Sequence, residues 1–235
     1  MKDTLKNLYR LLPVILLTGL TSCAVVEKSK LQWRHNGTVL SPHREVGTVL
    51  DNAYYAFDTP QGLYLAGFEI DNKGTNHPHL VFINKDLTGQ IHWPQTEAVE
   101  QLFFYNKQLY LLDETGKTQV RNGKQWQQAP LTLTANSKII TSENVLIACV
   151  PSPLPSADYT RGHCYSVTDH WRVDIAWRSV TPVLCNNTLV AVSDYPSREV
   201  VHQIELSTGK IIKQISLPAI PPDLCTSLSQ GKLNR

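Results

Sequence analysis

Residues 102–112 read LFFYNKQLYLL, and this stretch is the clearest guide to the fold. Four large apolar or aromatic residues, Leu102–Tyr105, are followed by the polar Asn106-Lys107-Gln108 and then by Leu109–Leu112. Runs of this length and composition, bounded by turn residues, are typical of two neighbouring antiparallel strands. The stretch therefore predicts a β-hairpin.

The same unit recurs three more times along the chain. Its second strand begins at residues 63, 109, 145 and 189, which gives steps of 46, 36 and 44 residues. Helical periodicity is almost absent, so the sequence predicts an all-β protein. Repeats of about 40 residues built from strands alone are typical of propeller blades. We expect four full units, with Leu224–Leu233 as a candidate start of a fifth.

The later halves of two units support this interpretation. His79–Asn84 is followed by the turn Thr88-Gly89 and by Gln90–Trp93, and Val201–Leu206 is followed by a second Thr-Gly turn and Lys210–Ile212. A strand, a Thr-Gly turn and another strand resemble the outer strands of quinoprotein-type and related propellers, including those of outer-membrane assembly lipoproteins. The other two units match this pattern poorly.

The expected architecture is one domain, residues 31–235, that forms a small closed β-propeller of four or five blades. An open β-sandwich is the alternative. The strand-like segment Leu31–Leu40 precedes the first unit. Propellers often close by pairing strands from both termini within one blade, which removes exposed edges that would otherwise invite aggregation. We expect that form of closure here.

The N-terminus has the pattern of a lipoprotein signal peptide. A basic segment precedes the apolar run Leu11–Leu20, which is half the length of about 20 residues needed to cross a bilayer as a helix. The next residues, Leu20-Thr21-Ser22-Cys23, resemble the lipobox of bacterial lipoproteins. That resemblance implies cleavage of residues 1–22, lipidation of Cys23, and a short tether over residues 23–30.

The residue after the lipid-bearing cysteine and the overall charge indicate location and exclude some partners. Ala24 replaces the aspartate that retains many lipoproteins in the inner membrane, so the resemblance implies the outer membrane, facing the periplasm. Without residues 1–22 the chain holds 19 Lys and Arg against 19 Asp and Glu. No basic run remains to neutralise phosphates, which argues against nucleic-acid binding. Membrane contact is expected through the N-terminal lipid.

Four cysteines remain once Cys23 is set aside: Cys149, Cys164, Cys185 and Cys225. An even number in an exported chain favours two disulfides, for which three connectivities exist. The repeat layout favours the pair 149 and 164 across one hairpin, and the pair 185 and 225 between the last unit and the C-terminal tail. Closing a loop of about 15 residues stabilises the fold by roughly 3 kcal/mol.

The sequence offers two weak sets of residues for chemistry. His77 and His79 are at strand spacing near Glu69 and Asp71, so they are weak candidates for a metal site, although a hairpin tip explains them better. Cys164 lies between His163 and His170, with Asp169 and Asp174 following, but a cysteine in a disulfide is no nucleophile. No glycine-rich phosphate loop, Gly-x-Ser-x-Gly or His-Glu-x-x-His motif occurs, and we expect no cofactor and no enzyme activity.

Two further features are candidates for binding. Trp93, Trp126, Trp171 and Trp177 lie near strand ends, where packing between blades explains them better than a ligand does. The Pro-rich loop from Pro151 to Gly162 is long for a hairpin, and a preorganised loop loses less entropy on binding. We take it as the candidate partner-binding surface, with the residues Pro151, Pro153, Pro155, Tyr159 and Arg161.

These observations favour a non-enzymatic protein-binding module on the periplasmic side of the outer membrane. Two versions are open: an envelope scaffold or assembly factor, and an immunity protein against a toxin delivered into the periplasm. The alternative class is a periplasmic carbohydrate-binding protein or hydrolase. That class requires His77 and His79, or the tryptophans, to converge in one pocket.

Overall fold

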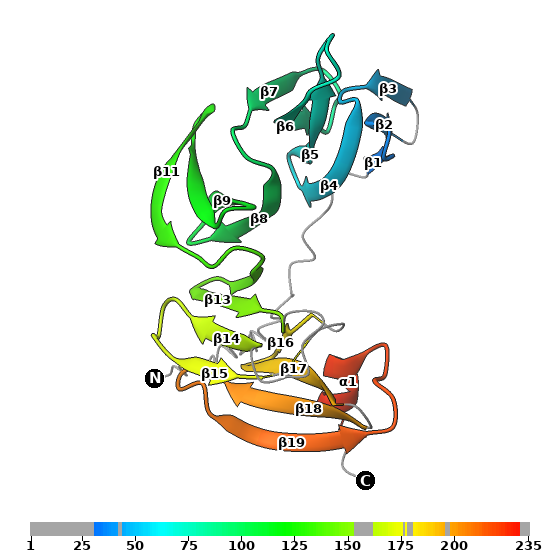
Figure 1. Ribbon diagram of the computed structural model, residues 1–235. Helices are drawn as coiled ribbons and strands as arrows, with labels where there is room; N and C mark the ends of the chain where they lie inside the picture. The colour runs from blue at the N-terminus through cyan, green and yellow to red at the C-terminus, as the bar shows by residue number, and fades with distance from the viewer. Residues whose placement is uncertain are drawn as a thin grey trace, which may run out of the picture.

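The computed structural model describes residues 31–41, 44–152, 162–175, 177, 181–195 and 198–230. The expected signal peptide, Cys23 and the tether lie outside these residues. The described chain is all-β with one short helix, and its strands form five antiparallel sheets. Each sheet uses strands that are consecutive in sequence, paired in chain order (Figure 1).

The first two sheets come from residues 32–94. The first sheet contains β1 (Gln32–Trp33), β2 (Thr38–Ser41) and β3 (Arg44–Thr48). The second sheet contains β4 (Asn52–Thr59), β5 (Gly62–Ile70), β6 (Asn76–Asn84) and β7 (Gln90–Pro94).

The third, fourth and fifth sheets each have four strands. The third sheet contains β8 (Val99–Tyr105), β9 (Gln108–Asp113), β10 (Lys117–Asn122) and β11 (Gln125–Thr132). The fourth sheet contains β12 (Lys138–Ser142), β13 (Val145–Val150), β14 (His163–Ser166) and β15 (Arg172–Asp174). The fifth sheet contains β16 (Val183–Cys185), β17 (Thr188–Tyr195), β18 (Arg198–Glu205) and β19 (Ile211–Leu217).

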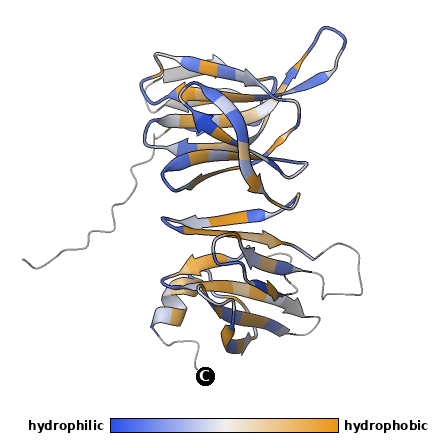
Figure 2. Cartoon of the chain, turned by 90° about the vertical axis from the view of Figure 1, so that its left-hand side faces the viewer, coloured by the Kyte–Doolittle hydropathy of each residue, from blue (hydrophilic) through white to orange (hydrophobic). Residues whose placement is uncertain are grey.

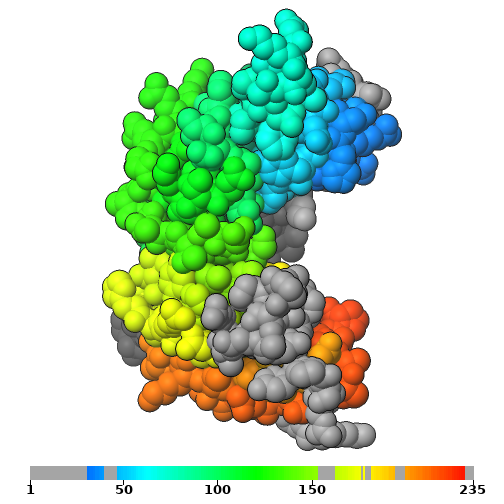
Figure 3. Space-filling view, in the orientation of Figure 1, coloured from blue at the N-terminus to red at the C-terminus, as the bar shows by residue number. Residues whose placement is uncertain are grey.

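The sheets follow one another along a curved, open arc (Figures 1 and 3). The first strands of neighbouring sheets are in contact, β4 with β8, β8 with β12 and β12 with β16. Successive four-stranded sheets joined through their first strands make the fold propeller-like. The second strands expected at residues 63, 109, 145 and 189 are β5, β9, β13 and β17. Five consecutive sheets, rather than two facing ones, exclude the open β-sandwich.

The two ends of the arc correct the expected closure. Within the described residues, the first sheet contains only strands that precede β4, so the termini do not share a blade. Leu224–Leu233 begins no fifth unit, because Leu224–Ser229 is the helix α1. Buried Leu224 and the neighbouring Ile220 and Leu228 pack on Val190, Val192 and Val201 of the fifth sheet. The helix therefore covers the face that the next sheet of a propeller would cover.

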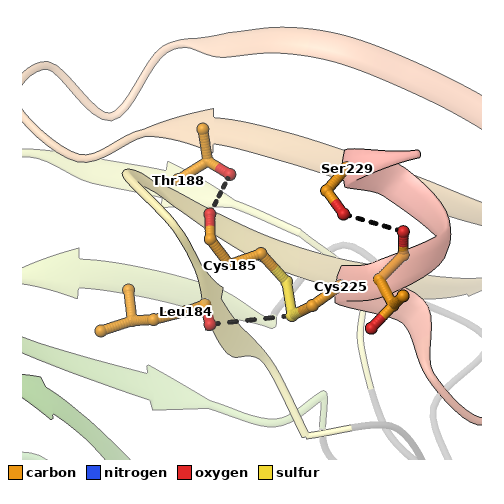
Figure 4. The surroundings of a disulfide bond; sticks show 6 residues. Leu184, Cys185, Thr188, Cys225 and Ser229 are labelled. Carbon is orange, nitrogen blue, oxygen red and sulfur yellow. Dashed lines mark hydrogen bonds between the residues drawn. A yellow bond between two sulfur atoms is a disulfide. The ribbon is translucent and has the colours of Figure 1, made fainter. Parts of the chain in front are cut away.

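A disulfide holds this helix in place (Figure 4). It joins Cys185, the last residue of β16, to Cys225 in α1, 40 residues later. The Cys225 sulfur lies 3.7 Å from the Leu184 carbonyl oxygen, and the Thr188 hydroxyl donates to the Cys185 carbonyl over 3.0 Å. A second disulfide joins Cys149 to Cys164, which are directly paired residues of β13 and β14. Both pairs are those that the repeat layout favours.

A β-bulge at the start of the first strand prepares two of the contacts between sheets. In β4 and in β8 two residues oppose one residue of the next strand, and the extra residues are Tyr54 and Glu100. A bulge re-aims the side chains around it. In both sheets the extra residue and the one after it, Tyr55 or Gln101, reach the following sheet.

Two tyrosine hydroxyls of the second sheet form hydrogen bonds with the backbone of the third sheet. The Tyr54 hydroxyl accepts a hydrogen bond from the Val99 amide over 2.8 Å. The Tyr55 hydroxyl accepts from the Leu102 amide over 3.1 Å and donates to the Leu102 carbonyl over 3.4 Å. Burial raises the pKa of Tyr54 to about 12, against the opposing effect of its bond from Val99. The phenol therefore stays protonated at neutral pH.

Between the third and fourth sheets, a side-chain amide of the third sheet forms hydrogen bonds with the backbone of the fourth. Gln101 donates from Nε2 to the Ile139 carbonyl and accepts at Oε1 from the Ile139 amide, both over 3.0 Å. Beside it, Lys138 Nζ lies 3.0 Å from Glu100 Oε1. One side chain thus satisfies both backbone groups of Ile139 on the edge of β12.

The fourth and fifth sheets meet through a continuous apolar core. Buried Trp171 and Trp177 pack there with Leu189, Ile204 and other residues of both sheets. The Trp171 indole donates to the Leu206 carbonyl. Gly209 has a positive φ of 69°, and a Cβ at this position would lie 2.7 Å from the Trp171 ring. The Thr-Gly turn therefore gives the indole room as well as turning the chain.

Hydropathy follows this architecture. Figure 2 shows hydrophobic residues, in orange, within the strands of every sheet and hydrophilic residues, in blue, at most hairpin turns.

The helix α1 has six residues. Among the described residues, no helix has the length and apolar character required to cross a membrane.

Candidate functional site

Three hairpin turns converge at one end of the first strands. They join β4 to β5, β8 to β9 and β12 to β13, and each has a two-residue loop between directly paired strand ends. Asn106 and Lys107 have φ values of 48° and 60°. Positive φ at both loop residues is the geometry that matches the twist of a tight hairpin. The second unit predicted from LFFYNKQLYLL is therefore a tight hairpin that presents Asn106 and Lys107 at its tip.

The three turns surround a hollow of about 920 Å³. Its lining residues come from all three: Pro60, Gln61, Phe104, Tyr105, Asn106, Lys107, Thr141, Ser142, Glu143 and Asn144. Phe104 is 43% exposed, although its ring centroid lies 5.8 Å from that of Phe57. The only charged groups among the described lining residues are Lys107 and Glu143, and none of these residues is a histidine or cysteine.

The hollow combines an exposed aromatic ring with polar turn residues. Interfaces between proteins typically place aromatic residues at the centre and polar groups around them. Phe104 and Tyr105 supply aromatic groups to the lining, and the turns supply amides and hydroxyls. The sequence analysis missed this hollow because each turn is unremarkable alone, and only the arrangement of successive sheets brings the turns together.

The tryptophans divide into two groups. Trp171 and Trp177 are buried in the core between the fourth and fifth sheets, as packing residues. Trp93 and Trp126 instead meet edge to face, 6.1 Å between centroids, and both line a second hollow of about 360 Å³ with Gln95, Gln119, Gln125 and other residues. Trp93 Nε1 donates to the Lys124 carbonyl over 2.8 Å, whereas Trp126 Nε1 is buried and has no hydrogen-bond partner.

A guanidinium stabilises this aromatic group. Arg121 lies 5.4 Å from the ring centroids of Tyr64, Phe82 and Trp93. Contacts of a cation with ring faces contribute about 0.5–2 kcal/mol each. Burial lowers the pKa of Arg121, which reflects its position among rings rather than in water. Trp93 is therefore held in place and its neighbour Trp126 is pre-positioned.

The predicted histidine pair does not form one site. His77 Nε2 lies 3.2 Å from Asp71 Oδ2, and His79 Nδ1 lies 3.4 Å from Glu69 Oε1. Hydrogen bonds from the Thr75 amide, the His77 side chain and the Lys73 amide lower the pKa of Asp71 to about 2. Asp71 and His77 thus organise the β5–β6 hairpin tip. The second imidazole beside His79 belongs to His92, on the next strand.

The residues around Cys164 are occupied by other contacts. Cys164 is in the disulfide with Cys149 and is fully buried, so it is no nucleophile. Asp169 accepts a hydrogen bond from the Ser166 hydroxyl over 3.1 Å, and Asp174 is paired with Arg172 over 3.0 Å. The constellation drawn from His163, Cys164 and the aspartates therefore has no free thiol at its centre.

The Pro-rich loop is only partly described. Pro151 is half-buried, and the adjacent Ser152 amide donates to the Trp177 carbonyl over 2.9 Å. Pro153, Pro155, Tyr159 and Arg161 lie outside the described residues. The loop therefore remains a prediction.

The sequence analysis also missed a buried polar group in the fifth sheet. Ser193 Oγ lies 2.8 Å from His202 Nε2, and His202 Nδ1 lies 3.1 Å from Gln214 Nε2. Burial lowers the pKa of His202. Ser193 is 4% exposed and His202 is 9% exposed, so these side chains satisfy one another within the sheet and present no reactive hydroxyl.

Comparisons with known proteins add little to this description. No family model and no curated protein matches the chain. Among solved structures, the chain is similar to Hsv2 of Kluyveromyces marxianus at 8% identity and a TM-score of 0.47, covering 81% of this chain and 65% of that one. Hsv2 of Kluyveromyces lactis gives 9%, 0.45, 81% and 64%. The computationally designed Ika8 protein gives 12%, 0.39, 80% and 74%.

The chain thus spans slightly less than two thirds of the length of these two Hsv2 structures. The TM-scores are below 0.5 and the identities are near 10%. The description of the fold as propeller-like therefore rests on the five sheets themselves.

Proposed function

We propose that this chain is a non-enzymatic protein-binding module, anchored through a lipid on Cys23 to the outer membrane and facing the periplasm. The supporting observation is the hollow between the three hairpin turns, where Phe104 is exposed among polar turn residues. The ring of Phe104 already packs beside that of Phe57, and a group that is ordered beforehand loses less entropy when a partner covers it. The Pro-rich loop that begins at Pro151 is a second proposed contact.

Photo-crosslinking in intact cells tests this proposal. A benzophenone amino acid placed at position 104 should give a discrete adduct of higher mass. The same group at position 212, on the outer strand β19, is the matched control because Ile212 is also an exposed hydrophobic residue, at 57%. Equal adducts at both positions, or none at position 104, would contradict binding at the hollow.

The adduct also separates the two versions of the proposal. An assembly protein in the adduct supports the scaffold role, whereas a secreted toxin supports the immunity role. The lipid anchor has its own readout, since Cys23→Ser should release the protein from the outer-membrane fraction. Retention of that variant in the membrane would contradict lipid anchoring at this residue.

Glycan binding is the second candidate function, and the pair Trp93 and Trp126 supports it. Amphipathic rings beside several glutamine amides can stack on a sugar face and bond its hydroxyls. Titration with envelope oligosaccharides should change tryptophan fluorescence in the unmodified chain and not in Trp126→Ala. A change of equal size in that variant would count against this surface.

A further inference from the structure

Three neighbouring strands of the second sheet bring Glu69, His79 and His92 together. Glu69 is on β5, His79 on β6 and His92 on β7. The register pairs Gly67 with His79 and Val81 with His92. Side chains two residues apart on a strand share a face, so Glu69 and His92 lie diagonally on either side of His79 on one face.

The distances between the polar atoms suit a single metal ion. Glu69 Oε1 lies 3.4 Å from His79 Nδ1 and 3.5 Å from His92 Nδ1. One ligand atom from each of the three residues lies within 4.8 Å of the others. With Zn–N and Zn–O bonds of about 2.0–2.1 Å, ligands of a tetrahedral site are separated by about 3.3 Å. Small side-chain movements are therefore sufficient to enclose an ion.

The hydrogen bonds around the imidazoles leave the right nitrogens free. His92 Nε2 lies 3.3 Å from Gln90 Oε1, and the tautomer with its proton on Nε2 both donates to this oxygen and leaves the Nδ1 lone pair on the side of Glu69. Such an outer bond to an amide oxygen is what fixes the tautomer of a metal-binding histidine. His79 Nδ1 is buried and has no hydrogen-bond partner. The cluster thus brings together two imidazole nitrogens and one carboxylate oxygen. No hydrogen bond joins His79 Nδ1 to that carboxylate.

The backbone around His79 is closely packed. A Cβ at Gly67, directly opposite, would lie 2.1 Å from the Asn52 carbonyl oxygen. Glycine at this position lets β4 approach and places no side chain across from the imidazole. The His79 side chain is 12% exposed, while those of Glu69 and His92 are 43% and 41% exposed. The site therefore has one largely covered ligand, His79, and is open to solvent on the side of the other two.

We propose that Glu69, His79 and His92 bind one zinc ion, with the fourth position taken by water or an external ligand. Two imidazoles and a carboxylate form a donor set that zinc prefers, whereas calcium and magnesium favour oxygen ligands alone. The ion would tie the three outer strands of the second sheet together. This inference is independent of the proposed partner surface.

Calorimetric titration with Zn²⁺ tests the site on the chelator-treated full chain, purified in detergent without a histidine tag. We expect one equivalent to bind, and His92→Ala or Glu69→Gln to weaken binding by more than about tenfold. His77→Ala is the matched control, since His77 is two residues from His79 and pairs with Asp71 instead. Its affinity should equal that of the unmodified chain.

A second measurement guards against misfolded variants. Each variant is compared with the parent by thermal unfolding in the presence of a chelator, and Zn²⁺ should then raise the midpoint of the parent and of His77→Ala only. Co²⁺ in place of Zn²⁺ should give the visible absorption of a four-coordinate site. Unchanged affinity in His92→Ala, or equal loss in His77→Ala, would overturn the assignment.

Discussion

The first three sheets and the last two differ in their crosslinks. Residues 31–132 contain no cysteine, and ring contacts link their strands and sheets, as between Tyr64 and Trp93 and between Phe57 and Phe104. The last two sheets have both disulfides and a continuous core around Trp171 and Trp177. Both regions bury apolar clusters between their sheets, and the last two sheets add covalent crosslinks.

The difference follows from where each part ends. Each inner sheet of the arc is covered on both faces by its neighbours, and buried apolar clusters fill the space between them. The fifth sheet has no following sheet, and it buries its last face under a helix of only six residues. Isolated helices this short are marginal in water. The disulfide from Cys185 to Cys225 stabilises this short helix in its position on the sheet.

Removing that disulfide should have the largest effect. We expect Cys185→Ala with Cys225→Ala to lower the free energy of unfolding by about 4 kcal/mol, because the bond closes a loop of 40 residues. Denaturant unfolding measures this loss. Hydrogen exchange should show α1 opening while the amides of β5 keep their protection.

The other disulfide is the comparison for this experiment. Cys149→Ala with Cys164→Ala should cost about 3 kcal/mol, since that loop spans 15 residues, and it should leave α1 protected. If the two double variants opened the same amides, the helix would not depend specifically on its own disulfide. The contrast between the two ends of the arc would then fail.

A smaller effect is expected at the joint between the two regions. Gln101→Ala removes both hydrogen bonds to Ile139 and leaves its amide and carbonyl without these partners. Unpaired backbone groups of this kind cost about 1–3 kcal/mol, so we expect a loss of about 2 kcal/mol. Hydrogen exchange of the Ile139 amide reports the change directly.

Gln128→Ala is the matched control for this variant. Gln128 is an exposed residue of β11 in the same sheet, away from the joint. Substitutions at such positions usually change stability by less than about 0.5 kcal/mol. Equal losses in both variants would show that the amide of Gln101 adds nothing to the joint.

The sequence predicted the strands well because their signals are local. Short apolar runs and polar turns located β5, β9, β13 and β17, and the hairpin layout favoured both disulfide pairs. The sequence did not predict the helix at the C-terminal end of the arc, and the reason is physical. Leu224–Ser229 is too short to show a clear helical period, and it packs as a helix over the fifth sheet, where the disulfide holds Cys225.

The candidate sites were harder to predict because they depend on register across strands. His77 and His79 are two residues apart and share a face, yet the partner of His79 is His92, which the pairing of β6 with β7 brings near. The turn hollow likewise joins residues about 40 positions apart. The sequence does contain a histidine on each of two neighbouring strands and a glutamate on a third. These residues predict a common site only once the register of the strands is known.

We expect the smallest effect on stability from the pH, through a buried histidine of the fifth sheet that differs from its counterpart in the second sheet. His79 in the second sheet lies beside the carboxylate of Glu69, whereas His202 in the fifth sheet lies between the neutral Ser193 and Gln214. Burial lowers the pKa of His202, so the unfolded chain binds this proton more readily than the folded chain does. Stability from this group is present above the unfolded pKa of about 6.5 and is lost as the pH falls toward the folded pKa.

Urea midpoints between pH 7.5 and pH 5 measure this loss. His202→Gln removes the titrating group and keeps an amide able to bond Ser193, so its midpoint should be lower at pH 7.5 and should depend less on pH than that of the parent. An unchanged slope would mean that His202 does not titrate differently in the two states. The contrast between the two regions would then rest on the disulfides alone.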